Sequence, residues 1–94
     1  MSIFTLNNTT SSTDTMHHIV GDIVVQSNGV FGGAVISFEY SNEEGMPFHI
    51  LDDFSMTKSD EKLMSLANSS NFKLIVTGAT ATTDIKISIL RRSL

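Results

Sequence analysis

The sequence predicts an all-β fold, a small antiparallel β-sandwich of jelly-roll-like or Greek-key topology. In several short segments apolar and polar residues alternate with a period of two, which is the pattern of strands with one buried face. Turn-forming residues separate these segments at intervals of about 8 to 12 residues, a spacing typical of sandwiches and barrels. With 94 residues, the chain holds one small domain.

The alternation begins after Met16 and is clearest in the first half of the chain. Between residues 18 and 27, one side of the predicted strand carries Ile19, Gly21, Ile23 and Val25. A second strand over 34–41 places Ala34, Ile36, Phe38 and Tyr40 on its inner side. The residues Ser-Asn-Gly at 27–29 predict a turn between these strands, because Asn and Gly tolerate positive φ, and 41–45 predicts the next turn.

Shorter strands are predicted in the second half of the chain. Pro47 lacks a backbone donor, so it is expected at a strand start or an edge, in a segment where Met46, Phe48 and Ile50 share one face. Asp52 and Asp53 interrupt this pattern. The remaining predicted strands are 54–57 (or a bend), 61–67, 72–77 and 85–90, and the turns between them are 58–60, 68–71 and 78–82. No helix longer than one or two turns is expected.

The inward positions of these strands define the predicted core. Its members are Ile23, Val25, Ile36, Phe38, Phe48, Phe72, Leu74, Val76, Ile85, Ile87 and Ile89. Outward positions also carry apolar residues, namely Val20, Val24, Val35, Leu51, Ile75 and Leu90. Only 17% of the residues are charged, which favours a domain that neighbouring subunits partly cover, and we expect a homo-oligomer or a subunit docked on a larger assembly. The alternative is that these side chains are scattered singly and tolerated.

The composition divides the chain into an N-terminal arm (1–15), a β-sandwich domain (16–90) and a short C-terminal tail (91–94). Residues 7–15 are polar and of low complexity, which predicts a mobile arm or linker. Ahead of them, Ile3, Phe4 and Leu6 are apolar. We expect them either to form a short strand that adds to a neighbour's sheet edge or to be a frayed terminus.

Several classes of function are not expected from this sequence. The chain has no cysteine, which removes disulfides, zinc-thiolate sites and cysteine nucleophiles. Its net charge is −4, so it lacks the basic stripe that binding to nucleic acid requires. No apolar run is long enough to span a membrane, and residues 1–15 lack the charges and apolar stretch of a secretory signal. We predict no cofactor.

The residue types used in catalysis and metal binding do not form a recognisable pattern. No Gly-x-Ser-x-Gly occurs. His17 and His18 are adjacent, so a regular strand points them to opposite faces, and a metal site would require His49 and a carboxylate to converge with one of them. The acidic residues Glu43, Glu44, Asp52, Asp53 and Asp60 lack the spacing of a calcium loop. We therefore expect surface imidazoles, turn-forming acids, no catalytic residue and no metal.

Residues 31–89 resemble a module of small structural proteins from the virions of tailed phages. The resemblance comprises the glycine pair Gly32–Gly33, the alternating strand AVISFEYS at 34–41, a glycine-containing turn, and the ending VTGATATTDIKISI at 76–89. Members of this group often carry an Asp-Gly…Trp element in the central hairpin. Here that position holds Glu44, Gly45 and Phe48, and the chain has no Trp.

The resemblance implies a β-sandwich subunit that decorates or cements a phage capsid. On this hypothesis the chain is not an enzyme, its partner is the major capsid protein, its location is the capsid exterior, and it forms a homo-oligomer, with a trimer favoured. The expected contact residues are Ile3, Phe4 and Leu6 in the arm and the outward residues Val35, Leu51 and Ile75. The alternative is a tail- or fibre-associated module that recognises a host receptor or glycan, although Tyr40 as the only Tyr makes a poor stacking platform.

Overall fold

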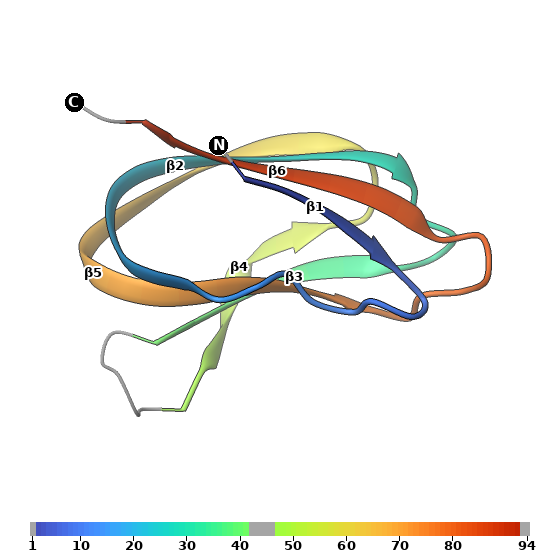
Figure 1. The fold of residues 1–94 in the computed structure, drawn as a ribbon, viewed down its shortest axis with the longest axis horizontal. Helices are drawn as coiled ribbons and strands as arrows, with labels where there is room; N and C mark the ends of the chain where they lie inside the picture. Colours follow the sequence, from blue (N-terminus) through green and yellow to red (C-terminus); the bar gives the residue numbers. More distant parts are fainter. Residues whose placement is uncertain (1, 42–46, 93–94) are drawn as a thin grey trace.

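The computed structural model describes residues 2–41 and 47–92, and these residues form six β-strands and no helix (Figure 1). The strands are β1 (Ser2–Asn7), β2 (Met16–Val30), β3 (Val35–Ser41), β4 (His49–Met56), β5 (Asp60–Thr77) and β6 (Asp84–Arg92). Their order in space is β1-β6-β2-β5-β3-β4, and every pairing is antiparallel. The predicted all-β antiparallel fold is therefore confirmed, but the strands belong to one continuous sheet rather than two separate ones.

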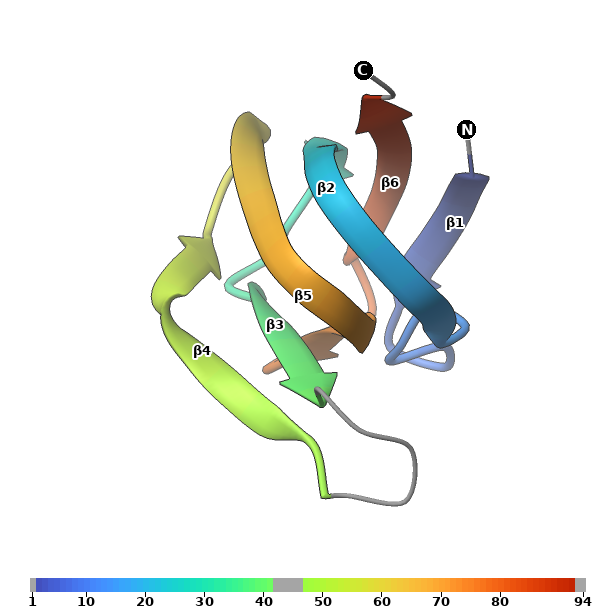
Figure 2. The same cartoon turned by 90° about the vertical axis from the view of Figure 1, so that its left-hand side faces the viewer.

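The sheet folds over on itself because β2 and β5 are long and bend (Figures 1 and 2). One layer contains β1, β6, the second half of β2 and the first half of β5, and we call it the β6 layer. The other, the β3 layer, contains β3, β4 and the second half of β5. The register between β2 and β5 shifts on both sides of Ile19, which is where the two strands curve from one layer into the other.

Two predicted turns do not occur, because long strands run through them. Residues 27–29 lie within β2, and 68–71 lie within β5. At the first position, the Ser27 hydroxyl donates to the carbonyl of Lys58 and accepts from the amide of Asp60. The hydroxyl of this buried serine therefore has hydrogen-bond partners although the residue lies within a strand. At the second, the side chain of buried Asn71 accepts the backbone N–H of His18. Tertiary partners thus hold turn-forming residues in extended structure.

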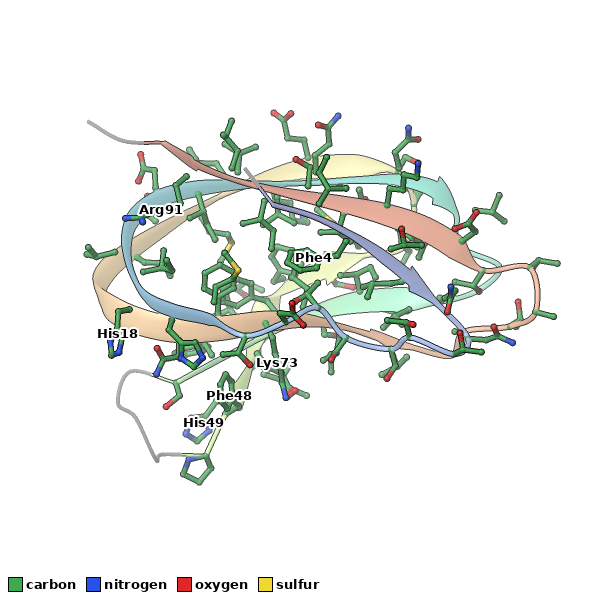
Figure 3. The ribbon with its side chains drawn as sticks, viewed as in Figure 1. Phe4, His18, Phe48, His49, Lys73 and Arg91 are labelled. Atoms are coloured by element: carbon green, nitrogen blue, oxygen red, sulfur yellow. The ribbon has the colours of Figure 1, made fainter. Side chains whose placement is uncertain are left out.

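The core lies between the two layers and matches the predicted set closely. All predicted members are buried except Phe48, which is half-buried on the β3–β4 side with the Lys73 Nζ atom 5.1 Å from its ring centroid (Figure 3). Phe38 is central, since its ring centroid lies 5.0 Å from that of Phe72 and 5.5 Å from that of Phe54. The buried hydrophobic residues that were not in the predicted set are Leu6, Ile19, Phe31, Ala34, Phe54 and Met56.

The N-terminal segment differs from the expected mobile arm. β1 pairs with β6 of the same chain over six residues, and Leu6 is completely buried. The polar stretch then crosses to the β3 layer, where Thr13 is buried and exchanges hydrogen bonds with Leu74: its N–H donates to the Leu74 carbonyl and its hydroxyl accepts the Leu74 N–H. The physical reason is that β6 needs a neighbour to cover its inner apolar side chains, and the arm provides it.

A cluster of threonines explains the Gly-Ala-Thr-Ala-Thr-Thr stretch at 78–83. Thr83 is buried, donates to the carbonyl of Phe31 at 2.8 Å and accepts the N–H of Thr80 at 2.9 Å. The Thr80 hydroxyl donates to the carbonyl of Gly32. Gly32 has φ +59, and a Cβ there would lie 2.7 Å from the hydroxyl oxygens of Thr80 and Thr82. The β2–β3 turn and the β5–β6 turn are thereby joined.

We predict that Thr83→Val lowers the free energy of unfolding by about 1 to 2 kcal/mol, because an isosteric methyl group leaves the Phe31 carbonyl and the Thr80 N–H without their partner. The matched control is Thr82→Val, whose exposed hydroxyl forms a hydrogen bond only with that of Thr80, and we expect it to change stability by less than about 0.5 kcal/mol. Urea denaturation measures both. Equal losses for the two variants would contradict the role assigned to Thr83.

Gly29 allows a close approach between β2 and β6. Its φ is +140, and a Cβ at this position would overlap the backbone carbonyl of Asp84. Gly33 offers a control, because its φ is +90 but no atom lies within 4 Å of the corresponding Cβ position.

We therefore predict that Gly29→Ala destabilises the domain by about 2 kcal/mol or more, since it adds a backbone collision to conformational strain. Gly33→Ala adds strain alone and is expected to cost about 1 kcal/mol. Thermal denaturation of the two variants checks the order. If the Gly33 variant were the less stable of the two, the backbone contact between β2 and β6 at Gly29 would not cause the larger loss of stability.

Candidate interaction surface

An apolar row crosses four neighbouring strands on the outer face of the β6 layer. Val24 of β2 lies opposite Leu63 of β5 on one side and opposite Leu90 of β6 on the other. Ile3 of β1 pairs with Ser88, two residues before Leu90, and so lies diagonally next to Leu90 on the same face. Together Ile3, Val24, Leu63 and Leu90 form what we call the outer apolar row.

Three of these four side chains are largely exposed to solvent. The exposed fraction is 64% for Ile3, 56% for Leu63 and 44% for Leu90, while Val24 is half-buried between its neighbours. Single exposed aliphatic residues are common on proteins, but a row on adjacent strands forms a contiguous surface. The row is therefore the strongest candidate for a contact site among the described residues.

The sequence carries a signal for this row that differs from simple alternation. Apolar residues are consecutive at 23–25 in β2 and at 89–90 in β6. Consecutive apolar residues are typical of strands covered on both faces, whereas strands with one solvated face alternate. Period-two alternation places Val24 and Leu90 among the outward apolar residues, whereas the ambiguous pattern of 61–67 gives no such indication for Leu63.

Polar and charged residues of both signs border the row along the strands. Asp22 and Arg92 are opposite each other in the β2–β6 ladder, and Lys86 lies on the same face of β6 as Leu90. On one side, Asp22 accepts a hydrogen bond of 2.7 Å from the Ser65 hydroxyl, and these two residues are opposite each other in the β2–β5 ladder. On the other side, Gln26 lies opposite Glu61. An apolar centre with a polar border of mixed charge favours a partner whose surface is apolar with polar residues around it.

The six contact residues predicted from the sequence do not form one surface. Ile3 belongs to the outer apolar row. Phe4 and Leu6 face inward opposite Ile87 and Ile85, and Figure 3 shows Phe4 between the layers. The other three residues, Val35, Leu51 and Ile75, are half-buried in or beside the β3 layer. Leu6 is therefore unable to contact a partner while β1 stays in place.

On the outer face of the β3 layer, the structure brings two of the predicted residues together. Ser37 pairs with Ile75, so Val35 is a diagonal neighbour of Ile75. The N-terminal segment crosses beside them, because Ser12 forms a bridge with Ile75. Leu51 lies on the edge strand β4 and packs against the core. Val35 and Ile75 thus form a smaller, partly covered pair on the opposite side of the molecule from the outer apolar row.

The histidines lie differently from the sequence expectation. The His17 and His18 ring centroids are 6.2 Å apart, and the rings lie beside each other rather than on opposite faces. The reason is that His18 has φ +54, at the irregular start of β2. His49 is on β4, with its ring centroid 6.4 Å from that of Tyr40 (Figure 3). Within residues 2–41 and 47–92, no three His, Asp or Glu residues gather as metal ligands would.

The backbone at His18 provides a direct test of this local geometry. We predict that His18→Gly is more stable than His17→Gly by about 1 kcal/mol, because only at position 18 does glycine relieve a left-handed conformation. Urea denaturation of the two variants checks this difference. Equal stabilities would show that residue 18 is extended like its neighbour.

Comparison with known protein families, with curated protein sequences and with solved structures finds no match to this chain. No helix in the described part of the chain is long and apolar enough to cross a membrane. Function is therefore inferred from the surface itself.

Proposed function

We propose that this chain is a structural subunit that binds an assembled protein surface, as a decoration or cement protein on the capsid of a tailed phage. The observation that carries the proposal is the outer apolar row, a contiguous aliphatic surface on an antiparallel β domain. The resemblance of residues 31–89 to small virion proteins supports the choice of the capsid as the partner. The row is then the surface that contacts the capsid protein.

The chemistry of the row suggests how such a subunit stabilises a lattice. Burial of aliphatic side chains contributes roughly 25 cal/mol per Å². Four side chains cover only part of the roughly 800 Å² per partner that a standard interface buries, so a single copy binds weakly. Several linked copies bind much more tightly to a repeating lattice, because each further contact is intramolecular. Since the repeat exists only in the assembled shell, binding shifts the equilibrium toward assembly.

The net charge of the chain adds a second, electrostatic contribution to this contact. The chain carries a net charge of −4, and Asp22 and Glu61 flank the row. A capsid surface with an excess of basic residues fits this net negative charge, and the attraction weakens as salt is added.

Serine substitutions in the row test the proposal. We predict that Leu63→Ser combined with Leu90→Ser changes the free energy of unfolding by less than about 1 kcal/mol, because both side chains are already exposed. The same variant is expected to lose binding to capsids of the phage that encodes the chain, prepared without this protein. Co-sedimentation with the capsids measures binding, and their melting temperature measures stabilisation.

Val30→Ser combined with Ile50→Ser is the matched control. These side chains are as exposed as those of the row, at 56% and 59%, but lie at the end of β2 and on β4. The control variant is expected to bind capsids normally. Normal binding by the Leu63/Leu90 variant would contradict the proposed surface, and attachment of the protein to tails rather than heads would support the receptor-binding alternative.

A further inference from the structure

We infer that β1 exchanges between copies of this chain, so that β1 of one copy takes the place beside β6 of a second copy. The interaction site is the strip of β6 that β1 covers, and the partner is an identical chain. This exchange concerns the chain alone, and only its use in linking subunits on a lattice rests on the proposed function.

The strip on β6 requires an occupant. Ile85 and Ile87 have no exposed surface while β1 is in place, and their partners across the ladder are Leu6 and Phe4. Without β1, these side chains and the backbone groups of β6 on that side lose their cover. An empty strip is therefore costly, and any copy whose own β1 has left is a receptor for another.

The chain's own β1 shows which occupant fits the strip. Its sequence, Ser-Ile-Phe-Thr-Leu-Asn, contains no charged residue and no proline. It can therefore move between two molecules of net charge −4 without carrying charge from one to the other. A second copy offers an identical strand with the same register, so the exchanged pairing has the same contacts as the internal one.

β1 can leave without breaking the pairing between any other two strands. It is hydrogen-bonded to β6 and forms the end of the strand order. The segment after it is fixed to β5, because the N–H of Val76 donates to the Ser11 carbonyl and the N–H of Thr13 donates to the Leu74 carbonyl. The joint between these two parts is therefore the exposed segment 8–10.

This joint is a tight turn that can open. The Asn7 side chain accepts the N–H groups of Thr9 and Thr10 and the hydroxyl of Thr9, and the Asn7 N–H donates to the Thr10 carbonyl at 3.0 Å. All these contacts are local and exposed, so water replaces them when the turn extends. Short hinges of this kind decide whether a terminal strand folds back or reaches a neighbour.

Concentration then determines which form is populated. A strand tethered by a short link has an effective concentration on the order of millimolar, so isolated copies in dilute solution keep β1 internal. Copies held side by side reach comparable local concentrations, and exchange links them. Oligomers joined in this way present several outer apolar rows at once.

Cysteine pairs test the exchange directly, since the chain has no native cysteine. Thr5 and Lys86 are exposed and lie opposite each other in the β1–β6 ladder. Thr5→Cys and Lys86→Cys are made in separate chains, mixed at high concentration, incubated and treated with a short bis-maleimide. We expect the cross-linked heterodimer at a yield about tenfold above that of a control mixture in which Ser55→Cys on β4 replaces Lys86→Cys. Equal yields in the two mixtures would overturn the inference.

Changes to the hinge give a second, independent measurement. Deletion of residues 8–10 removes the turn that folds β1 back, so the folded chain is expected to be a dimer or larger oligomer by light scattering. Insertion of Gly-Ser-Gly-Ser after Thr9 lengthens the hinge and is expected to give a monomer. Circular dichroism shows whether the deletion variant is folded. A folded deletion variant that is monomeric by light scattering would contradict exchange. Neither experiment involves capsids, so failure here is separate from failure of the proposed function.

Discussion

The bend in β2 and β5 is the constraint on which the rest of the structure depends. These two strands pair with each other on both sides of the bend, and their irregular register around Ile19 carries the ladder from one layer to the other. The curvature lets inward side chains of a single sheet face one another, so Ile23 and Val25 are completely buried. A flat sheet of the same strands would leave one entire apolar face in water.

The polar composition has a structural function in this fold. Serine, threonine and asparagine side chains satisfy backbone groups where ladders bend or turns meet, as Asn71 does at His18 and Thr83 does at Phe31. Among the described residues, no buried side-chain nitrogen or oxygen lacks a partner. Small uncharged groups meet these requirements inside a thin domain, where a buried charge would need a counterion. The low charge content agrees with this lack of space for buried ion pairs.

The β6 layer contains both features on which the proposed assembly depends, namely the outer apolar row and β1. The outer apolar row spans β1, β6, β2 and β5, and β1 is also the strand inferred to exchange. Movement of β1 to a second copy carries Ile3 with it, so exchange and the apolar surface are coupled through one residue. Under the two proposals, a subunit joins its neighbours by backbone pairing and contacts a lattice by side-chain burial, and the two contacts reinforce each other.

The period-two pattern by itself determined the all-β class and ten of the eleven predicted core residues, because alternation along a strand reports directly which side chains are inward. It also identified Val24 and Leu90 as outward apolar residues. Only the tertiary structure decided that 27–29 and 68–71 continue as strands, that Leu6 is buried, and that Leu63 completes the row. Each of these depends on partners distant in sequence, such as Asp60 for Ser27, Ile85 for Leu6 and Val24 for Leu63. A local sequence pattern does not specify which strands become neighbours in the sheet.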